Sequence, residues 1–163
     1  MDRRRVPVNR PQDHLRRAGL ELPPHPPAPA GAYRSATLDR GLLFTSGQVP
    51  LTDGQLFAQG KVGQEVEPGV AVLCAQAAAL NALAAAAEVI DLAEARACVS
   101  VRVFVAATPA FTDYVSVADG ASRVIAAAFP DAGLPVRTAV GVVSLPLDAP
   151  VEVELILTLD GNG

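Results

Sequence analysis

Arg137 has surroundings that suit the binding of a small anion. If the segment around Arg137 is a strand, Ala139 and Gly141 lie on the same face as Arg137, and their small size leaves open space beside the guanidinium. A guanidinium in such a space can hold a carboxylate through two parallel hydrogen bonds. The residues alone equally allow a structural ion pair between Arg137 and Glu152, Glu154 or an aspartate.

Glu152 and Glu154 share one face of the last strand candidate, VEVELIL. A glutamate at such a position usually faces solvent or pairs with a cation such as Arg102. If the last two strands formed a simple hairpin, Arg137 would lie opposite Thr158 and far from Glu152. A site that contains both residues therefore requires other strand neighbours or a contact between copies of the chain.

Elimination removes several kinds of chemistry. The two histidines, His14 and His25, precede the predicted folded body, which excludes Ser-His-Asp and Cys-His catalysis there, as well as metal clusters that contain histidine. Lys61 lacks the glycine and Ser/Thr neighbours of a phosphate-binding loop, and no G-x-G-x-x-G motif occurs. We expect no metal site.

The elements that would position these residues follow from hydrophobic periodicity. The pattern predicts strands over 33–38, 42–49, 55–62, 98–106, 135–144 and 151–159, with helices over 68–90 and 109–129. The order is βββαβαββ. It predicts an α+β fold in which two helices pack on one face of a mixed six-stranded sheet.

The N-terminal segment differs in composition from the rest. Six of the 13 basic residues lie within 1–19, so residues 20–163 hold seven basic and fifteen acidic side chains. We interpret 1–19 as a solvated, disordered tail rather than a nucleic-acid arm, and the proline-rich 20–31 as an extended arm. We expect the tail and arm to span 1–30 and one domain to span 31–163. The acidic body argues against nucleic-acid binding.

Location and assembly are predicted from composition. Cys74 and Cys98 form no C-x-x-C pair and there is no apolar signal segment, which together favour a cytoplasmic protein with reduced thiols. The apolar stretch 70–90 contains Gln76, Asn81 and Glu88, so we expect a buried helix and no membrane span. The core relies on small side chains, because half of the residues are hydrophobic but only 4% are aromatic. Burial between copies would add stability, which favours an oligomer.

Six short motifs in order resemble the RidA family, also called YjgF or L-PSP-like proteins. Over about 30–160, the chain has GAY at 31–33, LFTSGQVP at 43–50, GKVG at 60–63, PVRTAV at 135–140, LP at 145–146 and VEVE at 151–154. The family's interval of fifteen residues from its arginine to its first glutamate is kept between Arg137 and Glu152.

The resemblance implies a chorismate-mutase-like fold and a homotrimer with clefts between subunits, in which the last strand lies between earlier strands. It also implies hydrolytic deamination of reactive enamines and imines, such as 2-aminoacrylate, to 2-keto acids and ammonia. No cofactor is expected, since the imine is already electrophilic.

The same resemblance implies roles for individual residues. Arg137 would bind the substrate carboxylate, and Glu152 would position and activate the attacking water. Tyr33 would line the rim of the cleft, and backbone groups of Ala139 would contact the substrate nitrogen or water. Ser46 belongs to the substrate-binding set, although Ser46 as a turn-capping hydroxyl and Tyr33 as a structural rim residue are equally open interpretations.

Two alternatives stay open. Where many family members have Asn-Asp-Phe, this chain has Pro-Ala-Phe at 109–111, so one polar contact is missing. A non-catalytic binder of small carboxylates or 2-keto acids in the same clefts is therefore the main alternative. An endoribonuclease, which follows an old family label, comes third because the body is acidic and has no histidine.

Overall fold

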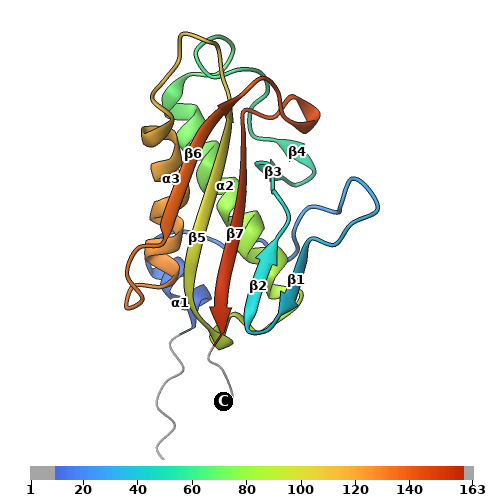
Figure 1. Ribbon diagram of the computed structural model, residues 1–163, viewed down its shortest axis with the longest axis vertical. Coiled ribbons are helices and arrows are strands. Elements are labelled where there is room, and N and C mark those ends of the chain that lie inside the picture. Colours follow the sequence, from blue (N-terminus) through green and yellow to red (C-terminus); the bar gives the residue numbers. More distant parts are fainter. Residues whose placement is uncertain (1–9, 160–163) are drawn as a thin grey trace, which may run out of the picture.

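A mixed sheet of five strands carries the fold (Figure 1), and the computed structural model describes residues 10–159. The strand order is β1-β2-β7-β5-β6; β5 and β6 are parallel and the other neighbours antiparallel. The α+β class and the mixed sheet are thus confirmed. The strands are β1 (Ala36–Asp39), β2 (Leu42–Thr45), β5 (Ala95–Ala106), β6 (Val136–Val142) and β7 (Val151–Leu159).

The predicted six-stranded sheet is wrong by one strand, because the expected strand 55–62 does not form. Only β4 (Gln55–Leu56) is extended there, and it pairs with β3 (Leu51–Thr52) in a separate small hairpin. Asp53 and Gly54 have positive φ values of 52° and 77°, as the two central residues of a tight hairpin turn require. Gly60, with φ of 102°, then turns the chain away from an extended path.

The last strand lies between two earlier strands, as the resemblance implied. β7 pairs with β2 on one side and β5 on the other, with Val153 opposite Val103 and Glu152 opposite Phe104. Val103 and Val153 are buried beneath the helices, so Phe104 and Glu152 lie on the opposite face of the sheet. The simple hairpin of β6 and β7 does not occur.

Two long helices cover one face of the sheet (Figure 1), as predicted. They are α2 (Pro68–Ala87) and α3 (Tyr114–Ala128), and short 3-10 turns occur at Leu92–Glu94 and Pro146–Asp148. The helices approach closely at Gly120, where an added Cβ would lie 2.0 Å from the Val72 carbonyl oxygen. α2 is long and apolar enough to cross a membrane, but its Ala-rich surface is mostly buried within the fold.

The expected start of the second helix at 109 is wrong. Asp113 is the N-cap residue, and its side chain accepts a hydrogen bond from the Ser116 backbone N–H at 3.2 Å. The carboxylate satisfies a helix N–H that would otherwise be unpaired, which fixes the first turn of α3.

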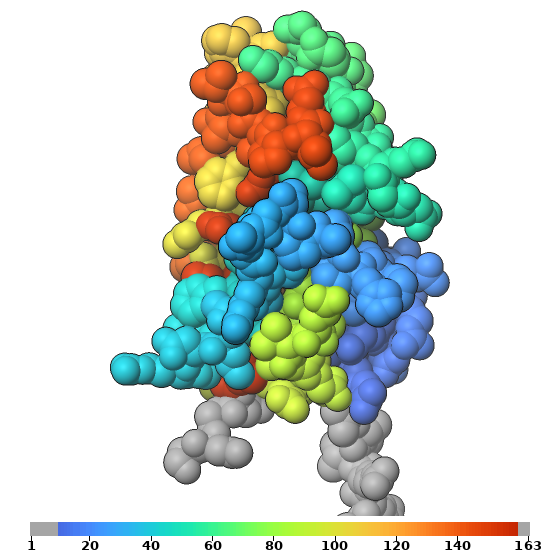
Figure 2. Space-filling model, turned by 90° about the vertical axis from the view of Figure 1, so that its right-hand side faces the viewer, coloured from blue at the N-terminus to red at the C-terminus, as the bar shows by residue number. Residues whose placement is uncertain are grey.

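The expected disordered tail is also wrong for residues 10–19. A short helix, α1 (Pro11–Arg17), packs on α3, and Leu15 is fully buried. The chain then runs in an extended arm, whose Leu20 and Leu22 pack against the core. Figure 2 shows the blue arm lying on the surface of the body. Residues 1–9, which hold Arg3, Arg4 and Arg5, lie outside the described residues.

A bulge follows β2. Between the pair Phe44–Ile156 and the bridge Gln48–Val153, three residues (45–47) lie opposite two residues of β7 (154–155). The extra residue interrupts the predicted strand 42–49. The Thr45 hydroxyl oxygen accepts the Leu155 backbone N–H at 2.9 Å in place of a ladder partner. The bulge brings the backbone of Gly47 against β7.

Candidate functional site

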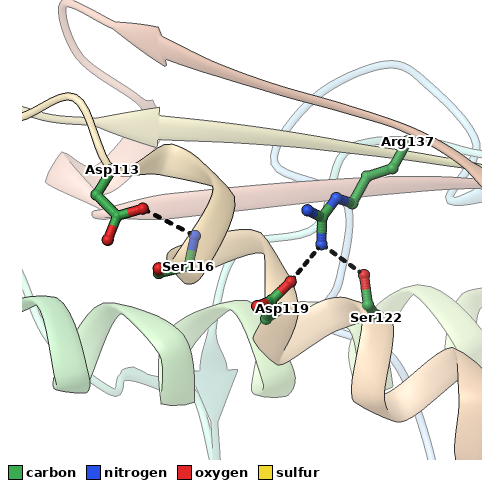
Figure 3. A network of polar contacts seen from close by, with 5 residues as sticks. All are labelled: Asp113, Ser116, Asp119, Ser122 and Arg137. Carbon is green, nitrogen blue, oxygen red and sulfur yellow. Dashed lines mark hydrogen bonds and ion pairs between the residues drawn. The ribbon is translucent and has the colours of Figure 1, made fainter.

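Arg137 lies on the helix-facing side of β6, at the edge of the sheet. It is in register with the buried Val101, so its side chain leaves the sheet toward α3. Nη1 donates to Asp119 Oδ1 at 2.7 Å and to Ser122 Oγ at 2.9 Å (Figure 3). The ion pair that the sequence left open therefore forms with Asp119, and not with either of the two glutamates.

These contacts use only one of the three nitrogens of the Arg137 guanidinium. Within residues 10–159, Nε and Nη2 of Arg137 have no hydrogen-bond partner. The Arg137 side chain is 24% exposed. The arrangement can accept a carboxylate while the ion pair with Asp119 stays intact.

Ala139 presents its backbone to the open edge of the sheet. The Val142 carbonyl accepts the Ala107 N–H, so Val142 faces β5. Because N–H and C=O groups alternate in direction along a strand, those of Arg137, Ala139 and Gly141 point away from β5. Outward-pointing groups on an edge strand are available to a ligand or to another chain.

Tyr114 was not singled out from the sequence, although it lies within the helix predicted over 109–129. Its ring packs edge-on against Phe111, with centroids 5.8 Å apart, and its hydroxyl lies over Gly141. A Cβ at Gly141 would lie 2.3 Å from that hydroxyl oxygen, so only glycine leaves it room. Arg137 and Tyr114 thus flank Ala139 on the same side of β6.

Glu152 lies on the other, helix-free face of the sheet, against Gly47. A Cβ at Gly47 would lie 1.8 Å from Glu152 Oε1. Burial, with a smaller contribution from the negative charge of Glu154, raises the pKa of the Glu152 carboxyl above its ordinary value. A half-buried carboxylate with a raised pKa suits proton exchange with water. Gly47 was not singled out from the sequence, although the TSGQ motif contains it.

Ser46 lies in the bulge next to Gly47, and it is hydrogen-bonded to the segment that follows Tyr33. The Ser46 hydroxyl donates to the Arg34 carbonyl, and the Ser46 N–H donates to the Ser35 carbonyl at 2.8 Å. These contacts favour the structural interpretation of Ser46. Tyr33 is half exposed, and its hydroxyl accepts the Ala30 N–H at 3.2 Å.

The candidate residues therefore form two groups in one chain. Arg137 and Ala139 lie on the helix-facing side of the edge strand, whereas Glu152 lies on the opposite face two strands away, beside Gly47. We call the first group, with Asp119, Ser122 and Tyr114, the arginine half-site, and the second, with Ser46, the glutamate half-site. No contact among the described residues places Tyr33 in either group. One chain does not bring them together.

Cysteine and metal chemistry find little support in the described residues. Cys74 and Cys98 are buried and free, and burial raises the pKa of Cys74 to about 11 and that of Cys98 to about 12. Neither thiol is a nucleophile at neutral pH. Across residues 10–159, no three His, Cys, Asp or Glu side chains converge as metal ligands.

Comparison with known proteins identifies a family and relatives for this chain. The model of the family described as Endoribonuclease L-PSP matches residues 24–159. Protein TCP17 of Trypanosoma cruzi is 34% identical over 149 residues, which cover 90% of this chain and 92% of that protein.

Solved structures agree over almost the whole chain. The protein Atu1372 of Agrobacterium tumefaciens, of unknown function, is 33% identical with a TM-score of 0.83 and coverage of 94% of each chain. A putative endoribonuclease from Shewanella oneidensis is 27% identical with a TM-score of 0.87, covering 92% of this chain and 99% of that one. This chain belongs to the Endoribonuclease L-PSP family, which the motif resemblance predicted under the names RidA and YjgF.

Proposed function

We propose that this protein hydrolyses reactive 2-enamino and 2-imino acids to 2-keto acids and ammonia, in clefts where the two half-sites of neighbouring copies meet. The observation that carries the proposal is the placement of Glu152. Its carboxyl lies against Gly47 with a raised pKa, on a face where nothing in residues 10–159 pairs it with a cation. The partly free guanidinium of Arg137 supplies the complementary carboxylate-binding group.

The helix-free face of the sheet supports an assembly of copies. Leu42, Phe44, Val136 and Val140 lie on this face and are all exposed in the single chain. Exposed apolar side chains gathered on one sheet face are typical of an interaction surface. We propose that further copies cover it in a homotrimer, and that each cleft takes Arg137 from one copy and Glu152 from the next.

The chemistry needs only these groups and water. An enamine such as 2-aminoacrylate tautomerises to 2-iminopropanoate, whose carboxylate binds Arg137. Glu152 accepts a proton as water forms a bond to the imine carbon, and the proton passes to nitrogen. The hydroxyl proton of the resulting carbinolamine then passes to nitrogen as the carbon–nitrogen bond breaks, which releases ammonia and leaves the keto group. Positioning supplies most of the acceleration, because the imine is already electrophilic.

The test measures release of ammonia and pyruvate from 2-aminoacrylate generated in situ by a dehydratase. Wild type should exceed the spontaneous rate, and Arg137→Ala should return it to that rate. Arg123→Ala removes an exposed arginine from the surface of α3 and is the matched control, which should keep full activity. Unchanged turnover in Arg137→Ala would refute the proposal.

Binding without catalysis is the competing outcome. Saturable binding of pyruvate to the wild type, lost in Arg137→Ala and accompanied by no acceleration, would select the carboxylate binder. RNA cleavage that survives extensive repurification and is lost in Glu152→Ala would instead favour the activity in the family's description. The acidic balance of residues 20–163 argues against that outcome.

A further inference from the structure

Asp119 and Ser122 occupy one end of the Arg137 guanidinium. Both accept from Nη1, at 2.7 Å and 2.9 Å, which uses the two N–H groups of that nitrogen (Figure 3). A guanidinium carries five N–H groups, so Nε and Nη2 keep three. Nε–H and one Nη2–H point in parallel and form a fork that fits a carboxylate. A ligand carboxylate can therefore bind without displacing Asp119.

Asp119 also neutralises the positive charge of Arg137, which is the charge that attracts a ligand carboxylate. The Asp119 carboxylate is 2.7 Å from the guanidinium and the side chain is 47% exposed, so it remains in contact with solvent beside the guanidinium. The pair Arg137–Asp119 has no net charge. One ligand carboxylate on the remaining fork makes the group negative, and the other side chains of the arginine half-site, Ser122 and Tyr114, supply no second cation.

We propose that Asp119 is a specificity-determining residue that restricts the site to imino acids with a single carboxylate. The inference rests on the proposed function. A second carboxylate on the substrate side chain would lie within several ångströms of Asp119, and the arginine half-site has no further cation to balance it. Repulsion between two carboxylates about 6 Å apart near a protein surface, weakened by solvent and salt, corresponds to about a tenfold loss of binding. A neutral or protonated imine nitrogen meets no such penalty.

Three variants distinguish the effect of the negative charge of Asp119 from the effect of the hydrogen bonds to Nη1 of Arg137. Asp119→Asn removes the charge but keeps an oxygen that accepts from Nη1, and Asp119→Glu keeps the charge. Ser122→Ala removes a hydrogen bond from the same nitrogen without changing the charge. If Asp119 only held Arg137 in place, Asp119→Asn and Ser122→Ala would act alike and would affect all substrates equally.

The experiment compares kcat/KM for 2-iminopropanoate and for the dicarboxylic 2-iminosuccinate, each generated in situ by an amino-acid oxidase. Wild type and Asp119→Glu should prefer the monocarboxylic imine. Asp119→Asn should reduce this preference about tenfold, mainly through a lower KM for 2-iminosuccinate. Ser122→Ala should leave the preference within about twofold of wild type. The Kd ratio for lactate and malate, measured by calorimetry, should shift in the same direction.

The outcomes separate the two proposals. Loss of activity in Arg137→Ala with an unchanged substrate ratio in Asp119→Asn would overturn the role of Asp119 alone. A wild type that binds and hydrolyses dicarboxylic ligands as well as monocarboxylic ones would do the same. Full activity of Arg137→Ala on both imines would instead refute the proposed function. The lactate and malate titration decides the role of Asp119 even for a protein without turnover.

Discussion

Substitution of Gly47 by alanine should remove most of the catalytic activity while the fold is retained. The added Cβ would lie 1.8 Å from Glu152 Oε1, 2.6 Å from Cδ and 2.9 Å from Cγ. Ordinary contacts of a Cβ begin near 3.4 Å, so the Glu152 carboxylate must move by about 1.5 Å. Gly47 is not in the left-handed region, so alanine introduces no backbone strain there.

The expected magnitude follows from this displacement. Misplacing a catalytic group by about 1 Å can reduce the rate on the order of a hundredfold, which is about 2.7 kcal/mol in activation free energy. The groups that must move are the end of a flexible side chain, so stability should change by less than about 1 kcal/mol. We therefore expect a fall in kcat of about a hundredfold, with the urea unfolding midpoint nearly unchanged.

The assay is ammonia release from 2-aminoacrylate, and Gly69→Ala is the matched control. Nothing lies within 4 Å of a Cβ at Gly69, which is in the first turn of α2, so that variant should keep full activity. Wild-type kcat in Gly47→Ala, or a loss of the same size in Gly69→Ala, would refute the reasoning.

Three further substitutions test the energetics of the fold, each by urea unfolding. Because burial raises the folded-state pKa of Glu152 above the ordinary 4.5, the contribution of Glu152 to wild-type stability should fall as the pH rises from about 4.5 through that pKa. Glu152→Gln should therefore unfold at higher urea than wild type at pH 7 but not at pH 4, and a loss at pH 7 would contradict this. Gly120→Ala should cost about 2–3 kcal/mol, because its Cβ would meet the Val72 carbonyl oxygen at 2.0 Å; no loss would show that the helices can separate freely. Leu15→Ala should cost about 2–4 kcal/mol if α1 is part of the core, whereas a solvated tail would lose less than about 0.5 kcal/mol.

Hydrophobic periodicity predicted most of the fold. The strand predicted over 98–106 is confirmed by β5, in which every second residue from Val101 to Val105 is a valine that is fully buried on the core face. Strand neighbours could not be read from this pattern, since alternation fixes which face is buried but not which strand lies beside it. The position of the last strand between β2 and β5 came from the motif resemblance instead.

Local backbone geometry explains what failed. Only Gln55–Leu56 of the strand predicted over 55–62 forms, and the positive φ of Gly60, which the sequence pattern does not reveal, interrupts an extended path to residue 62. α1 was missed although Pro11 at its first position and the apolar Leu15 are helix signals, because the surrounding arginines dominated the interpretation.

The sequence predicted which residues belong to the candidate site, but it did not predict how they are arranged in space. Arg137 and Glu152 were found from residue type and motif spacing, yet their opposite faces follow only from the registers of β6 and β7 against β5. Asp119 and Tyr114 could not be found from sequence, because their contacts with β6 depend on how α3 lies across the sheet.

Subunit mixing tests most directly whether the two half-sites come from different copies. Arg137→Ala and Glu152→Ala chains are each inactive on 2-aminoacrylate in our account. When equal amounts are unfolded together and refolded, about a quarter of the interfaces in a cyclic oligomer should join an intact Arg137 to an intact Glu152. We predict recovery of about a quarter of wild-type activity from two inactive proteins by this head-to-tail pairing. No recovery, in mixed oligomers shown to have formed, would contradict the shared site.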